Sequence, residues 1–430
     1  MSKQNNLTDF LTDVANAIRA KKGSTDLINP QNFSAEIAAL SGGLEVIEMT
    51  ETTATIEPNK VYVWGMVESL DITLGASTDE NDFFAFRFRC SKPTMTSVTV
   101  NGAIWADDTE LDAQGKPVLD LGSWYQCEIK GGTSALYARL AHYIPFEDAN
   151  VEAVLLAKGV GDGLGITYKD AAKVTTISTW FKSNANITSF DELKYFTKIK
   201  KMQEAEFARC SSLKKIQLPP ELSSMGGSIF SECSALKTIS FPETLTYVDG
   251  YCFEKCTSLE TVHLTEGLKT LKNAVFVNCT SLKELILPTG LTSIGTSLCQ
   301  NCKALTKIVI PSTLATINSF MCDGCSNITD VTINSGVNSI LNSAFRDCTS
   351  LKSIVLPDTL TRIDQYAFNG DSALVDLEIH AVEPPSLVWN SLPSNLVNIY
   401  VPDESVEVYK TATTWSSSAS KIKGISEKPS

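Results

Sequence analysis

A period of 23 residues runs through the second half of this 430-residue chain. Its clearest marker is a cysteine that recurs seven times without a slip, and an aspartate fills the eighth position. In chain order these residues are Cys210, Cys233, Cys256, Cys279, Cys302, Cys325, Cys348 and Asp371. Leucine or isoleucine follows three residues after each of them. A fixed period of this length indicates a solenoid, in which each coil buries its apolar face against the next coil.

Two further apolar positions lie six and eight residues after each cysteine, as Leu285 and Leu287 do after Cys279. Side chains alternate along a strand, so these two positions share one face, and we expect them to point into the core. Positions five and seven then face solvent. Proline usually follows position eight, and we expect it to end the strand because it cannot donate a ladder hydrogen bond.

The repeat C-x-x-L-x-x-I-x-L-P-x-x-L-x-x-I-x-x-x-A-F-x-x resembles the BspA-like leucine-rich repeats of bacterial surface and phage proteins, over about residues 187–380. This resemblance implies a leucine-rich-repeat solenoid that displays a binding surface. Solenoids need polar caps at both ends. The segment WFKSNANITSFDELKYFTKI resembles the family's opening cap, and the segment LPSNLVNIYVPDESVEVYKTATTWSSSASKIKGI resembles its closing unit.

The first 43 residues carry two apolar stripes at helical spacing. Leu7, Leu11 and Ile18 belong to the first stripe, and Phe33 and Leu40 belong to the second. So short a segment cannot bury two stripes by itself. We therefore expect it to dock onto the rest of the chain, onto sister chains or onto a larger assembly.

Residues 44–147 change to the alternating pattern that is typical of strands. Phe84, Phe86 and Phe88 are expected on one face of a strand, and Arg87 and Arg89 on the other. Turn signals separate the strands, which favours an antiparallel β-sandwich. The helical start and the segments IEPNKVYVWGMVESLDITL and FAFRFRC are similar to parts of tail and virion proteins of gut bacteriophages and prophages.

We therefore expect a multi-domain α+β protein with short N-terminal helices, an antiparallel β-sandwich and a leucine-rich-repeat solenoid of 23-residue coils with caps. The expected parts are a helical attachment segment at 1–43, a β-sandwich module at 44–147, a linker and opening cap at 148–186, the solenoid at 187–382 and a C-terminal cap at 383–430.

Composition argues against several classes of partner. The chain has 36 basic and 49 acidic residues, and its net charge of −13 creates no field that would attract nucleic acid. No run of about 18 apolar residues occurs, so we expect no insertion into a membrane. The polar, amphipathic start does not have the pattern of a Sec signal peptide.

Four cysteines have the spacing of a zinc site, namely Cys299, Cys302, Cys322 and Cys325. Cys302 and Cys325 are the repeat's own cysteines, and the other two fill an inward slot that phenylalanine holds in most coils. The repeat therefore produces this spacing without any metal. We expect buried, reduced thiols that act as small apolar groups, with no metal and no cofactor. Zinc and disulfides are the alternatives.

An enzyme would need a nucleophile, a base or paired carboxylates that converge in a pocket. The three histidines have no evident serine or cysteine partner at a motif spacing, and the chain has no phosphate-binding glycine loop. We predict no catalytic residues. The alternative is a glycan-active tail enzyme that uses carboxylates on neighbouring coils, such as Glu284 and Asp330.

The solvent side of the repeat sheet is the predicted recognition surface, centred on the fourth and fifth coils. Inward positions hardly vary between coils, whereas positions five and seven do. Ile286 and Val309 would stand side by side as an apolar patch in water, and such patches often mark partner sites with a polar rim. The competing explanation is that β-branched residues favour strands. The predicted binding residues are His263, Glu284, Ile286, Lys307, Val309, Asp330, Thr332 and Val355.

The sequence thus predicts a non-enzymatic tail or fibre protein of a phage or prophage, located on the virion. Its expected partners are a host cell-surface protein or glycan and, through residues 1–43, other virion proteins. A homo-oligomer is compatible with this interpretation. The alternative is an adhesin on the bacterial cell surface that uses the same repeats.

Overall fold

The structure is a computed structural model that describes residues 45–58, 60–67, 70–76, 83–90, 98–101, 103–105, 117, 124–131, 136–161 and 165–429. The chain divides into two compact units, residues 1–173 and residues 174–430, which are considered separately below. The helices expected within residues 1–43 lie outside the described residues. None of the helices in the described ranges has both the length and the apolar character needed to cross a membrane.

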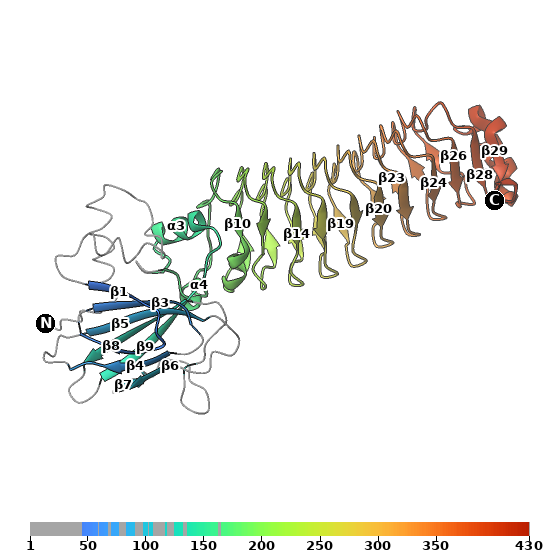
Figure 1. Cartoon of the computed structure of the whole chain (residues 1–430). Helices are drawn as coiled ribbons and strands as arrows, with labels where there is room; N and C mark the ends of the chain where they lie inside the picture. Colours follow the sequence, from blue (N-terminus) through green and yellow to red (C-terminus); the bar gives the residue numbers. More distant parts are fainter. Residues whose placement is uncertain are drawn as a thin grey trace. The chain divides into compact units, whose positions relative to one another are not determined.

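The first unit contains two β-sheets. In the described residues, β1, β3, β5, β8, β9 and β7 form one sheet in that order, and β2, β4 and β6 form the other (Figure 1). The strands are β1 Glu45–Met49, β2 Thr53–Ile56, β3 Lys60–Val67, β4 Leu70–Leu74, β5 Phe83–Cys90, β6 Val98–Asn101, β7 Ala103–Trp105, β8 Trp124–Gly131 and β9 Leu136–Tyr143.

One hydrophobic core joins the two sheets. Phe84, Phe86 and Phe88 from β5 are completely buried in it, together with Trp64 from β3 and Ile72 from β4. The rings of Trp64 and Phe86 meet edge to face, with their centroids 5.9 Å apart. The predicted inward face of the Phe84–Phe88 segment is therefore confirmed.

The prediction of an antiparallel sandwich is wrong for most strand pairs. Only β5–β8 and β8–β9 are antiparallel among the described pairs, whereas β1–β3, β3–β5, β7–β9, β2–β4 and β4–β6 are parallel. The physical reason is that successive strands from β1 to β7 alternate between the two sheets. Such winding returns the chain to each sheet in the same direction. Turn residues mark a reversal of the chain but do not reveal which sheet the next strand joins.

Two short helices follow this β-structure, α3 at Ala149–Ala157 and α4 at Tyr168–Ala171. Asp148 caps α3 by accepting a hydrogen bond from the Asn150 backbone N–H. Thr167 and Asp170 form a reciprocal capping box at the start of α4. The expected linker and opening cap at 148–186 thus contains helical structure and spans the division at residue 173.

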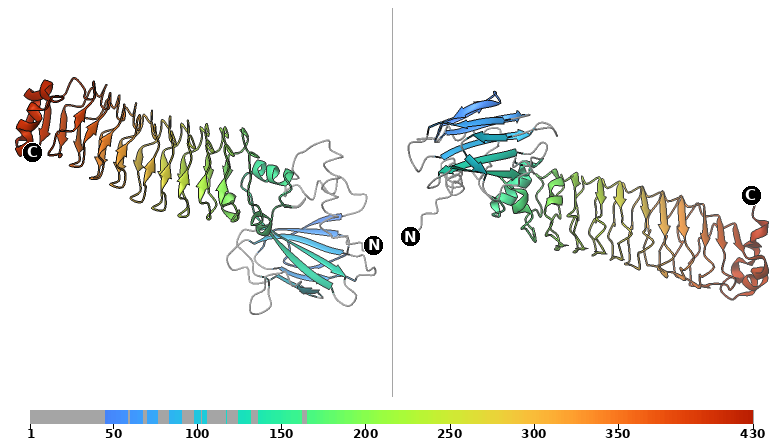
Figure 2. Two further views of the ribbon diagram at one scale, coloured as in Figure 1. Left: turned by 180° about the vertical axis from the view of Figure 1, so that it is seen from behind. Right: turned by 90° about the horizontal axis from the view of Figure 1, so that it is seen from below.

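The second unit is a solenoid, with coils stacked in sequence order from β10 to β29 (Figures 1 and 2). In each coil the repeat's L-x-x-I-x-L segment forms a short strand. We call the column of these strands the outer sheet. Its strands are β12 Lys215–Ile216, β14 Thr238–Ser240, β16 Thr261–His263, β18 Glu284–Ile286, β20 Lys307–Ile310, β22 Asp330–Ile333, β24 Ser353–Leu356, β26 Asp376–Ile379 and β28 Asn398–Val401.

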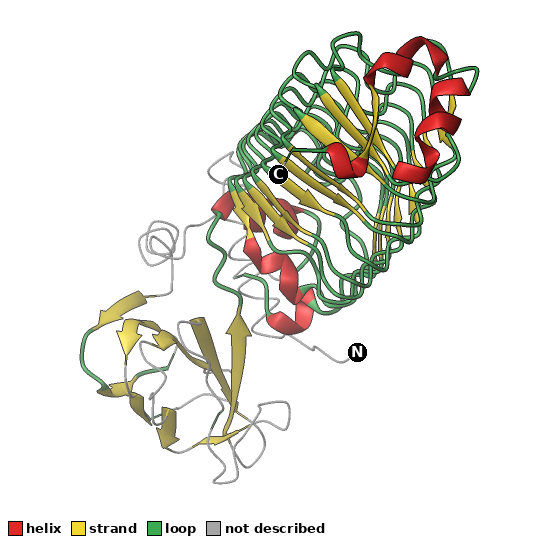
Figure 3. Ribbon diagram, turned by 90° about the vertical axis from the view of Figure 1, so that its right-hand side faces the viewer, coloured by secondary structure: helices red, strands yellow, loops and turns green. Residues whose placement is uncertain are grey.

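A second column of two-residue strands lies on the other side of the coils (Figure 3). These are β11 Lys201–Met202, β13 Ser224–Met225, β15 Tyr247–Val248, β17 Thr270–Leu271, β19 Ser293–Ile294, β21 Thr316–Ile317, β23 Ser339–Ile340, β25 Arg362–Ile363 and β27 Ser386–Leu387. Where strands of neighbouring coils pair, the pairing is parallel in both columns. At the start of the unit, β10 Ser189–Phe190 pairs with β12, and the 3-10 helix η1 follows at Asp191–Tyr195.

The repeat's inward positions form the core of the solenoid, as predicted. In most coils the side chains at positions six and eight are buried, for example Leu285 and Leu287. Two coils differ, because Val262 and Val331 are only half-buried. The outer sheet is interrupted between β12 and β14, between β16 and β18 and between β22 and β24, and the last two interruptions come directly after these coils.

A column of stacked phenylalanine rings fills the interior. Phe207, Phe230, Phe253 and Phe276 lie one coil apart, with successive ring centroids separated by 5.4 to 5.5 Å. Stacking of identical rings is possible because the 23-residue period places the same slot of each coil directly above the last.

Short elements complete the C-terminal end of the solenoid. They are the 3-10 helix η2 at Asp403–Ser405, α5 at Val406–Thr411, η3 at Ser416–Lys421, β29 at Ile422–Gly424 and η4 at Ile425–Glu427. β29 pairs with β28 and extends the outer sheet. The Tyr409 hydroxyl donates to the Ala381 carbonyl at 2.7 Å, and Trp415 Nε1 donates to the Pro385 carbonyl at 2.8 Å. These two buried side chains anchor the segment 402–429 onto the last coil.

Candidate recognition surface

The predicted binding residues lie on the solvent side of the outer sheet. Glu284, Asp330, Thr332 and His263 are exposed, and Lys307 and Val309 are half-buried. Ile286 is 57% exposed and Val355 is 45% exposed, which is unusual for large apolar side chains in a well-packed solenoid. The structure therefore presents all eight residues to solvent to some degree.

Backbone pairing sets the neighbours within this surface. Glu284 aligns with Lys307 and Ile286 with Val309 between β18 and β20. Lys307 then aligns with Asp330 between β20 and β22, and the Lys307 Nζ lies 3.4 Å from Asp330 Oδ2. The apolar pair thus stands directly beside a ladder of alternating charge.

The structure joins some predicted residues more closely than others. The strands β18, β20 and β22 form one continuous three-stranded sheet, which carries six of the predicted residues. His263 lies on β16 and Val355 on β24, and each belongs to a neighbouring sheet. The continuous part of the candidate surface is therefore β18–β22, with His263 and Val355 at its borders.

Beyond Val355 the surface is closed by the C-terminal segment. Lys428 Nζ and His380 Nε2 each lie 2.6 Å from a carboxylate oxygen of Glu378. Burial alone would raise the pKa of Glu378, but hydrogen bonds from Lys428 and His380 hold that pKa below its usual range. This ion-paired cluster makes the C-terminal border of the surface polar.

The same geometry bears on the alternative of a glycan-active enzyme. Glu284 and Asp330 are two coils apart, and Lys307 lies in register between them. A pair of catalytic carboxylates must flank a scissile bond across open space. Here a cation occupies the intervening position and forms an ion pair with one of the two carboxylates.

The recurrent cysteines link neighbouring coils by hydrogen bonds. Each thiol donates a hydrogen bond to a backbone carbonyl of the preceding coil, 26 residues earlier in most cases. Cys233 Sγ lies 3.1 Å from the Phe207 carbonyl oxygen, and Cys302 Sγ lies 3.1 Å from that of Phe276. Cys127 and the ten cysteines of the solenoid are buried and free. Burial raises the pKa of the Cys252 thiol to about 12, so that thiol remains protonated at neutral pH.

Three of the four cysteines with zinc-like spacing come together. Among the described residues, Cys299, Cys322 and Cys325 place their sulfur atoms within 4.8 Å of one another. Cys299 Sγ and Cys322 Sγ are 3.4 Å apart. Cys302 does not belong to this group, and its thiol donates to the Phe276 carbonyl. A structural zinc site has four protein ligands, and this group offers three.

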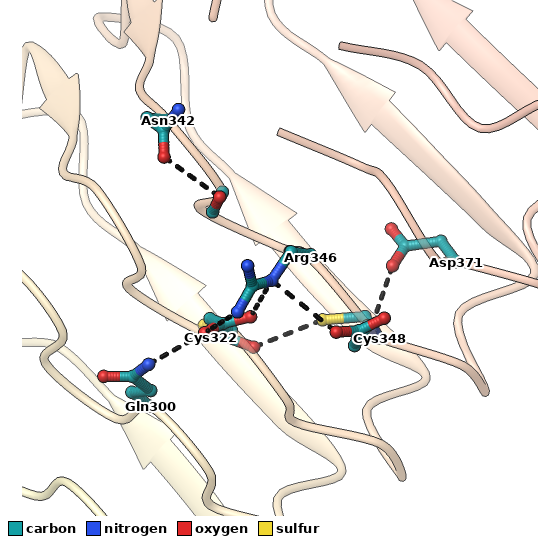
Figure 4. A network of polar contacts seen from close by, with 9 residues as sticks. Gln300, Cys322, Asn342, Arg346, Cys348 and Asp371 are labelled. Carbon is teal, nitrogen blue, oxygen red and sulfur yellow. Dashed lines mark hydrogen bonds and ion pairs between the residues drawn. The ribbon is translucent and has the colours of Figure 1, made fainter. Parts of the chain in front are cut away.

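A charge network around the buried Asp323 was not anticipated from the sequence (Figure 4). Arg346 contacts both carboxylate oxygens of Asp323, with Nε–Oδ1 and Nη2–Oδ2 distances of 2.7 and 3.0 Å. Gln300 Nε2 donates to the same carboxylate at 2.8 Å. The hydrogen bonds to Asp323 raise the pKa of Arg346, and together with the Gln300 hydrogen bond they satisfy this almost fully buried aspartate. The signal was present, since all three residues lie two positions before a repeat cysteine on successive coils.

Comparisons with known proteins identify the repeat. A family model described as "BspA type Leucine rich repeat region" matches six copies, at residues 175–306, 263–375 and 292–412. Together these matches span residues 175–412, which is more than half of the chain. No curated protein matches the chain.

Solved structures of leucine-rich repeat proteins are also similar to it. One from Bacteroides ovatus has 24% identity and a TM-score of 0.39, and the match covers 56% of this chain and 70% of that one. A leucine-rich cell surface protein from Faecalibacterium prausnitzii has 20% identity and a TM-score of 0.27, with 58% and 86% covered.

Proposed function

Because the chain belongs to the BspA-type leucine-rich repeat family, we propose that it is a non-enzymatic adhesion or recognition protein whose outer sheet binds a cell-surface partner. We further propose that it is a tail or fibre protein on the virion of a phage or prophage. In this proposal residues 1–43 attach it to other virion proteins. The virion assignment rests on the resemblance of its N-terminal half to such proteins.

One observation carries the recognition proposal. Ile286 is 57% exposed and lies in register with Val309 on a continuous sheet, beside the Glu284–Lys307–Asp330 ladder. Exposed apolar side chains with a charged border are typical of the centre and rim of protein-binding sites. The core gains nothing from an isoleucine at a solvent position, so binding is a reason for it to be there.

The second candidate is an adhesin on the bacterial surface, which the family assignment favours. Both candidates would use the same outer sheet and differ in where the protein resides. Immunogold labelling with an antibody against the repeats separates them. Label on induced particles supports the virion proposal, and label confined to host cell walls supports the adhesin.

The binding surface is tested by replacing Ile286 and Val309 together with serine. The full chain should melt at nearly the same temperature, but its binding to host cells should fall at least about tenfold, which corresponds to about 1.4 kcal/mol. The matched control replaces Val382 and Val408, two exposed valines outside the outer sheet, with serine. Equal binding by the Ile286/Val309 variant and the parent would place recognition elsewhere.

A further inference from the structure

A pocket of about 800 Å³ opens where the last repeat coil meets the C-terminal segment. This volume lies within the range of small-molecule sites, which is about 300–1,000 Å³. The pocket is bounded by the 387–396 loop, by Asn369 and Ser372 of the preceding coil, and by Ser417 and Lys421 of η3. All of these residues belong to the solenoid unit.

A departure from the repeat creates the pocket. Arg362 pairs with Ser386, so the register between these coils is 24 residues instead of 23. The Phe368 backbone N–H then donates to the Ser391 carbonyl, which places Leu392 in the slot that phenylalanine holds in the coil before. The stacked pair of Phe345 and Phe368 therefore has no ring after it, and the half-buried Leu392 lines the pocket.

Trp389 stands at this pocket as the most exposed large apolar side chain among the described residues, at 68%. Its ring is held from one side by Tyr366, which meets it edge to face at a centroid distance of 5.9 Å. The loop is tied to the preceding coil, because the Tyr366 backbone N–H donates to the Asn390 carbonyl at 3.2 Å. An exposed indole is thus presented on a braced backbone.

The far wall of the loop is also held in place. The side-chain amide of Asn395 donates to the carbonyls of Asp371, Ser372 and Leu374 at 3.2, 3.1 and 2.8 Å. Three contacts from one amide fix the loop to the coil beneath it. The pocket is therefore formed before any ligand binds, which lowers the cost of ordering on binding.

The lining has a distinctive chemistry. Asparagine amides and serine and threonine hydroxyls predominate, and these groups both donate and accept hydrogen bonds. Of the described residues that line the pocket, Lys421 alone is charged, although the chain carries 49 acidic residues. A polyhydroxylated, uncharged ligand matches this lining. The C–H face of a sugar ring also stacks on an indole, whose ring is apolar on its faces and polar at its N–H.

We propose that this pocket binds an uncharged oligosaccharide, with one sugar ring stacked on Trp389 and its hydroxyls bonded to the asparagine and serine side chains. The inference rests on the proposed recognition function and names a ligand class for it. The site lies at the C-terminal end of the solenoid, apart from the Ile286–Val309 pair. The protein would then hold its target through two separate contacts, one to a glycan and one on the outer sheet.

The full-length protein is to be screened on an array of neutral and acidic glycans, and the best-bound trisaccharide is then titrated by calorimetry. Trp389→Ala should lower the affinity at least about tenfold, and Trp389→Phe should keep it within about threefold. Tyr251→Ala removes an exposed aromatic residue elsewhere on the solenoid and should leave the affinity for the trisaccharide unchanged. Absence of binding to any glycan, or equal binding by Trp389→Ala and the parent, would overturn the proposal.

Cell binding separates this inference from the proposed function. Periodate treatment of host cells, which oxidises glycans, should reduce binding of the parent and leave no further effect of Trp389→Ala. If only protease treatment reduces binding and only the Ile286/Val309 variant is impaired, a protein receptor is used and the glycan site is refuted while recognition stands. If the parent binds no cells at all, the proposed function itself fails.

Discussion

Asp371 occupies the register position that cysteine holds in the seven preceding coils. Its side chain is completely buried, and Oδ1 accepts a hydrogen bond from the Cys348 backbone N–H at 2.7 Å. Oδ2 has no hydrogen-bond partner among the described residues. Burial raises the pKa of Asp371 from its ordinary value of 3.8 to about 9. The carboxyl group is therefore protonated in the folded protein at neutral pH.

The raised pKa makes stability depend on pH. The unfolded chain loses the Asp371 proton near pH 4 and the folded chain near pH 9, so stability falls as pH rises between these values. Each pH unit in this window costs about 1.4 kcal/mol, which gives about 4 kcal/mol between pH 5 and pH 8. Glu206, whose pKa burial raises to about 7, adds a decline in the same direction that ends near pH 7.

Asp371→Asn keeps the oxygen that accepts from Cys348 and removes the ionisable group. We expect the variant to lose less stability than the parent between pH 5 and pH 8, by up to about 4 kcal/mol. Its unpartnered amide N–H₂ costs about 1–3 kcal/mol at every pH, so the pH-dependence is the diagnostic quantity and the absolute stability is not.

Hydrogen exchange of the segment 345–375, corrected for the intrinsic effect of pH, measures this local stability. A local probe is needed because long repeat arrays do not unfold as a single two-state unit. Asp358→Asn makes the same substitution at an exposed aspartate and is the control. Parallel pH profiles for Asp371→Asn and the parent, or a parent that becomes more stable toward pH 8, would refute the reasoning.

The remaining predictions concern the thiols and the N-terminal segment. The cysteines should be reduced and metal-free, so native mass spectrometry should detect neither zinc nor an intramolecular disulfide; one zinc per chain that disappears on mutating Cys299 and Cys322 would contradict this. Deleting residues 1–43 should leave the thermal melting of the repeats nearly unchanged, because the two apolar stripes predicted for this segment indicate a role in assembly. It should abolish incorporation into particles or oligomerisation, and a deletion variant that assembles normally would disprove the prediction.

The solenoid could be predicted because its packing repeats with its sequence. A slot such as that of Leu285 must be apolar in every coil, since each coil rests on the next, and the period makes the requirement visible. The strand pairing of the first unit could not be predicted in the same way. Alternation at Phe84, Phe86 and Phe88 identifies the buried face of a strand, but it does not show whether that strand runs parallel or antiparallel to its neighbours. Direction depends on which sheet the intervening strand joins, and no local signal records that.

The outer-sheet surface and the C-terminal pocket also differ in whether the sequence alone could predict them. Ile286 could be singled out because it is an apolar residue at a position of the coil that faces solvent, where a polar residue is expected. Trp389 could not, because the register lengthens to 24 residues before Ser386, so a 23-residue period does not align Trp389 with its counterpart Gln365 in the preceding coil. Packing constrains the inward slots, so the residues free to specialise are those at solvent positions, such as Ile286, and those in the stretch where the repeat lengthens. A glycan site at the irregular last coil is consistent with that division, and the Trp389 variants decide whether it exists.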